Sequence, residues 1–499
     1  MRKEFPRVTP ESVGIPSASI ETLLDRLEEG WTEPHGLMIM RHGKVCAEGW
    51  WAPYAPGVRH GLQSHTKTYD ATAVGIAYTE GLLKLTDRLV EIFPDEIPEN
   101  PSENLKKLTV RDVLCMGCGM DTMPGPSKDW IREFLAIPVN HVPGTTFMYN
   151  SMGSVLLAAI VRKLTGLGLH DYLKPRLFDK IGIDADNLRW VSLPDGMEFA
   201  LHATTEDNLR LMKLYADGGV WEGERILAED YVKLATSKQN DSATERAVNP
   251  PAEDNFVGYG FQIWMCRPKG VYRADGAMGQ FTIVFPDRDM LLAITENASG
   301  STGGAMPQKA LDTIWQWLDS LPAADVQTLP EDPAASAHLA RRMQMLALPA
   351  PRRSPESAVQ QQINGCTYAA EAGLFSLLGN TGKLFFRNEN AVFPAGVLHF
   401  AFGDNRCILT SQEDGQTVSI TAATDGTYAY NTLPGFPSIA LCSGCWEQEN
   451  VLKITLRMLE TCNEQYITFT FGDDGTAQAL LSSNQIFSKT GKPVRLTKI

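Results

Sequence analysis

The chain has 499 residues, of which 43% are hydrophobic and 21% are charged, and its formal net charge is −14. This length suggests two or three domains, and this composition excludes large-scale disorder. The acidic balance, with no basic stretch to offset it, argues against nucleic acid or an anionic membrane as a partner.

The N-terminal sequence lacks the apolar core of a secretory signal, and the longest apolar run, 155–161, is far shorter than a membrane span. We therefore expect a cytoplasmic protein with reduced cysteines. Two C-x-x-C pairs, Cys115/Cys118 and Cys442/Cys445, lie far apart in the chain, so a shared zinc site is not expected.

The first part of the chain alternates between helical and strand patterns. Apolar spacing predicts a helix over 20–28 and a hairpin formed by 36–42 and 44–51. Periodicity and caps predict further helices over 68–81, 109–114, 128–135, 152–164, 205–216 and 307–318. Strands are predicted over 258–265, 270–274, 281–285 and 290–295. We expect residues 1–320 to form one domain.

The second part has a different composition. Residues 321–362 are rich in Pro and Ala, which is typical of a linker, with a short helix over 338–346. Short β-type runs follow over 367–378, 383–387, 397–402, 418–423, 451–458 and 465–471. We predict that residues 363–499 form a separate antiparallel β-barrel or sandwich.

The motif Ser64-His65-Thr66-Lys67 places a hydroxyl and an amine one helical turn apart, at the predicted N-terminus of a buried helix. Residues three apart share a helix face, so Lys67 can reach the Ser64 hydroxyl, and the helix dipole favours negative charge there. A serine beside a lysine of lowered pKa is a known type of activated nucleophile. A capping serine with a solvated lysine is the alternative interpretation.

A tyrosine and a glycine-rich corner complete the pattern. Tyr149 precedes a buried helix, and beside Lys67 its pKa would be lowered, so that the phenolate could take the proton from Ser64. Half-buried packing is the alternative for Tyr149. The corner Gly276–Gly279 joins two predicted strands, and its glycines allow close approach of a ligand, unless it is simply a tight hairpin.

These segments resemble the serine β-lactamase and penicillin-binding-protein superfamily, most of all its class C-like branch of esterases, D-aminopeptidases and 6-aminohexanoate-dimer hydrolases. The resemblance covers about residues 8–320 and is carried by SHTKTYDATAVGIAYTEGLLKLTDRL, LTVRDVLCMGCGMD, PGTTFMYNSMG, HATTEDNLRLMKLYADGG and GYGFQIW…RADGAMGQ. It implies an α+β fold, with an antiparallel sheet flanked by helices, a helical subdomain, and the site between them.

The resemblance also implies roles for single residues. Ser64 would be the acylated nucleophile, Lys67 would share its proton network, and Tyr149 would be the general base and later the acid for the leaving group. The backbone N–H groups of Ser64 and Ala277 would form the oxyanion hole. Three residues are candidates for lining the cleft: Ser151, Gly276 and His202. For His202, a structural role is expected.

Two positions depart from the motifs of this superfamily. The usual Y-x-N reads Tyr149-Asn150-Ser151, so a hydroxyl replaces a carboxamide. The third motif, K-T-G or H-x-G in the family, corresponds to Ala274-Asp275-Gly276 and lacks the side chain that helps to hold a substrate carboxylate. An uncharged ester or amide would therefore suit this site better.

The remaining candidates have mainly structural interpretations. His65 lies one residue past Ser64 on the helix and is expected to point away from it. The run over 300–304 is expected to be a loop, since no Lys-Ser/Thr follows it. Three aromatic residues fit cleft walls and strand packing equally: Tyr259, Trp264 and Tyr272. The absence of a G-x-S-x-G elbow argues against an α/β-hydrolase.

The sequence therefore predicts a serine hydrolase that forms an acyl-enzyme with a small ester, amide or short peptide and requires no metal or organic cofactor. The alternatives are a peptidase or amidase specific for D-residues or linear amides, and a catalytically silent binding protein with the same fold. The substrate, the role of the C-terminal domain and the oligomeric state are not predicted.

Overall fold

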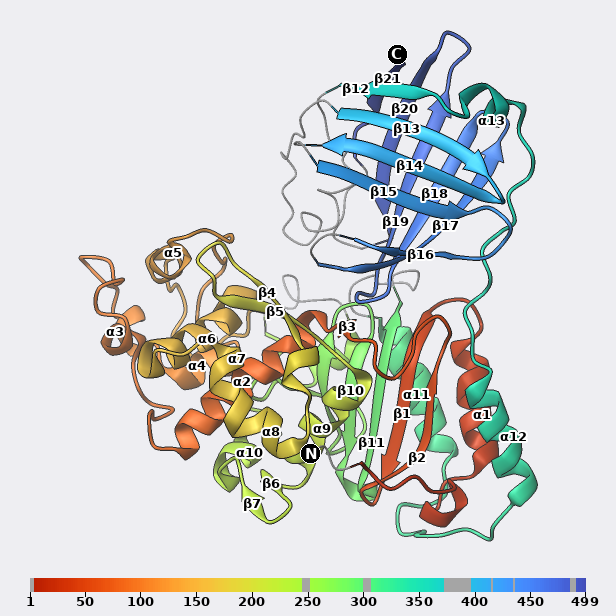
Figure 1. Cartoon of the computed structure of the whole chain (residues 1–499). Coiled ribbons are helices and arrows are strands. Elements are labelled where there is room, and N and C mark those ends of the chain that lie inside the picture. The colour runs from red at the N-terminus through yellow and green to blue at the C-terminus, as the bar shows by residue number, and fades with distance from the viewer. Residues whose placement is uncertain are drawn as a thin grey trace. The chain divides into compact units, whose positions relative to one another are not determined.

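A computed structural model describes residues 4–244, 252–298, 307–371, 396–413, 416–433, 436–484 and 491–499. The chain divides into two compact units, Met1–Ala347 and Leu348–Ile499. The first unit combines antiparallel sheets with helices, and the second is an antiparallel β-barrel, so the predicted fold class is confirmed (Figure 1).

A six-stranded antiparallel sheet forms the centre of the first unit, in the order β2-β1-β11-β10-β9-β8. Its strands are β1 (Glu33–Arg41), β2 (Lys44–Trp50), β8 (Trp264–Met265), β9 (Tyr272–Gly276), β10 (Gln280–Phe285) and β11 (Met290–Asn297). The predicted hairpin of β1 and β2 is confirmed. Every residue of β9, β10 and β11 is buried, which is typical of strands that are covered on both faces.

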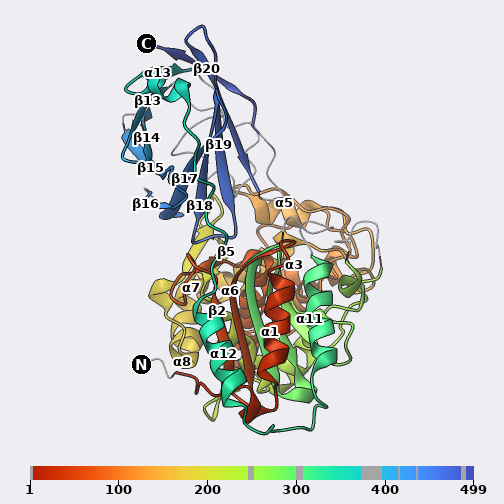
Figure 2. The ribbon, with the colours of Figure 1, turned by 90° about the vertical axis from the view of Figure 1, so that its right-hand side faces the viewer.

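Helices cover this sheet. α1 (Ser17–Leu27), α11 (Gln308–Ser320) and α12 (Pro333–Gln344) pack together on one face (Figure 2), and α9 (Thr205–Ala216) packs against β10 and β11. α9 begins with a capping box, in which the Thr204 hydroxyl accepts from the Asp207 N–H and the Asp207 carboxylate accepts from the Thr204 N–H.

The structure differs from the expected boundary at residue 320. α12 lies in the predicted linker, yet it packs against α1 and β2 and belongs to the first unit. The physical reason is its apolar face, where Leu339 and Met343, four residues apart, are both buried. Composition alone had indicated a linker because the flanking residues are rich in Pro and Ala.

The helical part of the first unit surrounds α2 (Thr66–Thr79). From Thr66 to Ala77 every residue of α2 is buried except Lys67, which is partly exposed. α2 packs against α6 (Ser151–Thr165), α7 (Leu169–Leu173) and α10 (Glu229–Ala235). The other elements are α3 (Leu89–Ile92), α4 (Val110–Leu114), α5 (Trp130–Ala136), α8 (Asp179–Ile181), β3 (His60–Gly61), β4 (Arg189–Ser192), β5 (Glu198–Ala203), β6 (Val220–Trp221) and β7 (Glu224–Arg225).

The predicted strand over 258–265 is mostly irregular, and only its last two residues form β8. Gly258 and Gln262 have φ angles of +152° and +55°, which break an extended conformation. Tyr259 makes an isolated bridge with Trp264, so the segment folds back on itself. An alternating apolar pattern could not reveal this turn.

The second unit is built around a ten-stranded sheet that closes through a parallel β15–β17 pair. Its elements are α13 (Ala358–Ile363), β12 (Thr367–Ala370), β13 (Gly396–Gly403), β14 (Arg406–Glu413), β15 (Gln416–Ala423), β16 (Ala429–Thr432), β17 (Ile439–Gln448), β18 (Val451–Met458), β19 (Glu464–Phe471), β20 (Thr476–Ser483) and β21 (Val494–Lys498). Large side chains such as Phe400, Trp446 and Phe469 fill its interior. The predicted run over 383–387 lies outside the described residues.

The described ranges contain no cluster of three or more His, Cys, Asp or Glu side chains arranged to hold a metal ion. All nine cysteines are free, and the two C-x-x-C pairs lie in different units. In the same ranges no single helix has the length and apolar character of a membrane span, although α6 and 169–181 reach it together across a 70° bend.

Candidate active site

Ser64 lies in a short 3-10 turn, Gln63–His65, that leads directly into α2. Lys67 Nζ donates a hydrogen bond to Ser64 Oγ at 2.9 Å, as the sequence spacing predicts. Gln63 has a φ of +51°, so the backbone is strained next to the candidate nucleophile. Ser64 and Lys67 are both partly exposed.

The amine of Lys67 is held in an environment that favours its neutral form. Burial lowers the pKa of Lys67 to about 8, although the carboxyl groups of Asp70 and Asp275 oppose this shift. An amine that is neutral near this pH can accept the proton of a hydroxyl at hydrogen-bond distance. The structure therefore places an amine of lowered pKa directly beside Ser64.

Tyr149 is the third member of the group. Its side chain shares a hydrogen bond with Ser64, and Lys67 Nζ lies 5.2 Å from the centroid of its ring. Trp264 stacks on the Tyr149 ring with a centroid distance of 5.7 Å and an interplanar angle of 14°. The structure thus brings Ser64, Lys67 and Tyr149 together, as predicted.

The predicted pKa change of Tyr149 is wrong in direction. Burial raises the pKa of Tyr149 above its ordinary value, although the hydrogen bond to Ser64 opposes this shift. The prediction rested on the positive charge of Lys67, but burial of the phenol itself outweighs the interactions that lower its pKa. Of these two groups, Lys67 is therefore the better proton acceptor near neutral pH, and Tyr149 remains a neutral phenol.

The aromatic residues around Trp264 support Tyr149 from behind. Trp264 is buried and packs edge-on against the equally buried Tyr259, at a centroid distance of 4.7 Å. Phe147 completes the cluster at 5.6 Å from Trp264. Tyr259 and Trp264 are therefore packing residues, and the buried Tyr272 on β9 is another.

The end of β9 approaches the nucleophile closely. A Cβ atom on Gly276 would lie 2.1 Å from the carbonyl oxygen of Leu62, two residues before Ser64. Only glycine fits at such a distance. The glycine-rich corner after β9 is therefore held beside the turn that carries Ser64.

The same corner orients the predicted oxyanion donor. The Gly276 carbonyl accepts a hydrogen bond from the Gly279 N–H at 3.3 Å. In a trans peptide the C=O and N–H point in opposite directions, so the Ala277 N–H is directed out of the turn. Among the turn and cap hydrogen bonds of the described backbone, none uses the N–H of Ala277 or of Ser64.

Arg273 and Asp275 form a buried ion pair at the third motif, Ala274-Asp275-Gly276. Arg273 Nε donates to Asp275 Oδ2 at 2.7 Å, and both side chains are at most 1% exposed. Arg273 Nη2 also donates to Asn255 Oδ1 at 2.6 Å. The sequence reasoning missed this pair. Its signal was available, because residues two apart on a strand share a face, and two opposite charges interrupt an otherwise apolar strand.

The other predicted site residues differ in their exposure and contacts. Ser151 is the first residue of α6 and is partly exposed. His202 is fully buried on β5, with Nδ1 3.3 Å from the Arg189 carbonyl, which favours the structural role expected for it over a place in the cleft wall. The predicted loop over 300–304 lies outside the described residues.

His65 points away from the site, as predicted. It is buried, and its Nε2 lies 3.0 Å from Thr282 Oγ1 on β10. Burial lowers the pKa of His65 to about 4, so the imidazole is neutral at physiological pH. His65 therefore links the start of α2 to the sheet and does not act as a base for Ser64.

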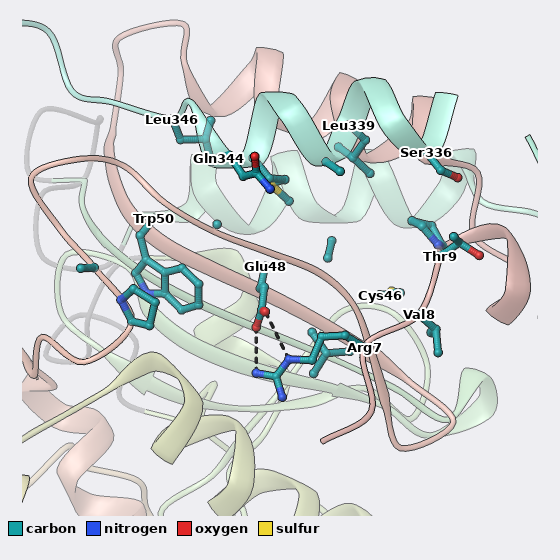
Figure 3. A pocket seen from close by; sticks show the side chains of 18 of the residues that line it. Arg7, Val8, Thr9, Cys46, Glu48, Trp50, Ser336, Leu339, Gln344 and Leu346 are labelled. Carbon is teal, nitrogen blue, oxygen red and sulfur yellow. Dashed lines mark hydrogen bonds and ion pairs between the residues drawn. The ribbon is translucent and has the colours of Figure 1, made fainter. Parts of the chain in front are cut away.

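A separate pocket of about 810 Å³ lies between β2 and α12 (Figure 3). Arg7 borders it and pairs with Glu48 through two contacts, Nε to Oε1 at 3.2 Å and Nη2 to Oε2 at 3.0 Å. Leu339 and Leu346 contribute apolar surface. None of the predicted catalytic residues lines this pocket.

The chain matches a known protein family and a characterised relative. The beta-lactamase family profile matches residues 20–313, more than half of the chain. The 6-aminohexanoate-dimer hydrolase of Paenarthrobacter ureafaciens is 28% identical over 302 residues, which cover 54% of this chain and 74% of that protein.

The chain is also similar to solved structures. A candidate 6-aminohexanoate-dimer hydrolase from Bacillus anthracis is similar over 66% of this chain and 89% of its own, at 19% identity and a TM-score of 0.50. The octameric penicillin-binding protein homologue from Pyrococcus abyssi is similar over 96% of this chain and 99% of its own, at 16% identity and a TM-score of 0.47. The family match and the relative from Paenarthrobacter ureafaciens together indicate a hydrolase. The chain belongs to the beta-lactamase family.

Proposed function

We propose that this protein is a serine hydrolase that forms an acyl-enzyme on Ser64 with a small, uncharged ester or amide. The observation that carries the proposal is the 2.9 Å contact between Lys67 Nζ and Ser64 Oγ, at a lysine whose pKa is lowered to about 8. A serine paired with a lysine of lowered pKa, half of which is neutral at pH 8, is an activated nucleophile.

The steps follow from the positions of these groups. Ser64 Oγ attacks the substrate carbonyl carbon while its proton passes to neutral Lys67, and the N–H groups of Ser64 and Ala277 bind the oxyanion that forms. The tetrahedral intermediate then collapses, and the Tyr149 hydroxyl passes a proton, replaced from Lys67, to the departing oxygen or nitrogen. Water attacks the acyl-enzyme by the reverse sequence and releases the acid.

The charge of the third motif favours an uncharged substrate. The Arg273 guanidinium is paired with Asp275 and hydrogen-bonded to Asn255, so its positive charge is compensated within the protein. A substrate carboxylate would find no uncompensated cation at this motif. This supports a neutral ester or amide over a penicillin or a peptide C-terminus.

Hydrolysis of linear amides is the second candidate. Its support is the curated relative at 28% identity, which is named a 6-aminohexanoate-dimer hydrolase. A panel of acyl nitrophenyl esters, 6-aminohexanoate dimer, and D- and L-aminoacyl amides separates the two candidates. A kcat/KM for the dimer or the D-aminoacyl amides that exceeds the value for esters would favour the amidase.

Covalent labelling tests the acyl-enzyme proposal directly. A fluorophosphonate probe is expected to add once to the wild-type protein, and mass spectrometry of its peptides is expected to map the adduct to Ser64. Ser64→Ala is expected to show neither the adduct nor hydrolysis of short acyl nitrophenyl esters. Equal ester hydrolysis by the two proteins, or an adduct elsewhere in the chain, would exclude the proposal.

The rate is expected to depend on pH through Lys67. Below its pKa of about 8 the amine is protonated and cannot accept the Ser64 proton, so kcat/KM should rise with pH and reach half its maximum near pH 8. Initial rates with a nitrophenyl ester between pH 6 and 9.5, corrected for spontaneous hydrolysis, check this. A flat profile would show that Lys67 is not the titrating base.

A further inference from the structure

The corner after β9 is held by more contacts than a hairpin turn requires. Its middle residue, Met278, has a φ of +65°, and its carbonyl accepts a hydrogen bond from the Ala298 N–H at 2.9 Å. On the other side, a Cβ on Gly279 would lie 2.0 Å from Glu296 Oε1, so the Glu296 carboxyl packs directly against this glycine. The turn is therefore held by contacts with residues at the end of β11.

The Gln280 side chain takes the place of backbone hydrogen bonds at the point where β10 and β11 separate. The last residue pair in the register of these strands is Phe281 with Ile294. Beyond it, the buried Gln280 carboxamide bonds both backbone groups of Glu296: Nε2 donates to the carbonyl at 2.6 Å, and Oε1 accepts from the N–H at 3.3 Å. The side chain thus acts as an additional peptide group between the strands.

The same carboxamide reaches the predicted oxyanion donor. Gln280 Nε2 also donates to the Ala277 carbonyl at 3.3 Å. This bond fixes the peptide that follows Ala277, and the bond between Gly276 and Gly279 fixes the peptide that precedes it. Because the peptide groups on both sides of Ala277 are held, the orientation of the Ala277 N–H is fixed.

We propose that Gln280 is a positioning residue that sets the orientation of the Ala277 N–H in the oxyanion hole. This inference rests on the proposed acyl transfer at Ser64, and Gln280 acts only through the Ala277 carbonyl and the Glu296 backbone. Hydrogen-bond donors that are held in place before the reaction stabilise the oxyanion without reorganisation, which affects the transition state more than substrate binding.

The test compares the full-length wild type with Gln280→Leu, which keeps a similar volume and removes all three hydrogen bonds. Loss of a complete oxyanion donor lowers kcat by about 100- to 1,000-fold, so we expect its misplacement to lower kcat by about tenfold. KM should stay within about twofold of the wild-type value. The inhibition constant of phenylboronic acid, whose Ser64 adduct places an oxygen in the oxyanion hole, should rise by the same factor as kcat falls.

Gln308→Met is the matched control, because Gln308 is a partly buried glutamine whose carboxamide bonds Asp254 and not the corner after β9. It is expected to shift the Tm with no change in kcat. Gln280→Glu, which keeps the side-chain size and the acceptor oxygen, is measured at pH 8 as a second variant in case Gln280→Leu does not fold. An unchanged kcat in a folded Gln280 variant, or a rise in KM alone, would overturn the inference.

Fluorophosphonate labelling of the wild type separates this inference from the proposed function. A wild type without a Ser64 adduct would overturn both. A labelled wild type with full activity in a folded Gln280 variant would overturn only the positioning role.

Discussion

Replacement of Lys67 by methionine is expected to lower kcat/KM for nitrophenyl esters by about 100- to 10,000-fold, the range that general base catalysis contributes. Methionine has a similar length, so the packing around α2 should survive, but it cannot accept the proton of Ser64. The amine already bears a desolvation cost that lowers its pKa to about 8, so its removal should leave the free energy of unfolding unchanged or increased.

The measurement combines kcat/KM with the Tm and a pH profile. The rise in rate near pH 8 should disappear in Lys67→Met, because the titrating group is gone. Lys163→Met is a suitable control, since Lys163 is an exposed lysine near the end of α6 that pairs with Glu96 at 3.5 Å. Wild-type rates in a folded Lys67→Met protein would refute a catalytic role for this amine.

Replacement of Gly276 by alanine is expected to reduce kcat by about 100-fold, because it displaces the turn that carries the Ala277 N–H. The new Cβ would lie 2.1 Å from the Leu62 carbonyl oxygen, which is too close for two non-bonded atoms. Since that oxygen belongs to backbone next to the Ser64 turn, β9 and the turn must separate. Overpacking of this kind costs about 1 to 3 kcal/mol of the free energy of unfolding.

Gly57→Ala is the matched control for this substitution. Gly57 has no heavy atom within 4 Å of the site where a Cβ would be added, so the same chemical change should leave kcat and the Tm close to wild type. Both variants are compared by steady-state kinetics and thermal unfolding. A Gly276→Ala protein with wild-type kcat would show that the turn does not supply an oxyanion donor.

Local patterns in the sequence predicted much of the fold. The helix over 205–216 and the hairpin of β1 and β2 were predicted because each depends on neighbours in the chain. The spacing of Ser64 and Lys67 predicted their contact for the same reason. No local pattern predicts that Tyr149 approaches Ser64, since this contact depends on tertiary packing; the family resemblance strengthened that assignment.

The features that sequence reasoning missed depend on long-range geometry. The direction of the Tyr149 pKa shift is decided by burial, which a motif does not display. The role of Asp275 was hidden because its partner, Arg273, had no apparent function in the motif. The contacts of Gln280 join residues of different strands, and nothing in the chain near Gln280 indicates where β10 and β11 separate.

The burial of α2 has a consequence for how such an enzyme can change its substrate. Between Thr66 and Ala77 only Lys67 escapes full burial, so nearly every substitution in this helix would disturb the core as well as the chemistry. Ser151 at the start of α6 is partly exposed, so a wider choice of side chains should fit there. Evolution or laboratory selection for a new substrate should therefore meet less constraint at partly exposed positions such as Ser151 than in the buried helix that follows the nucleophile.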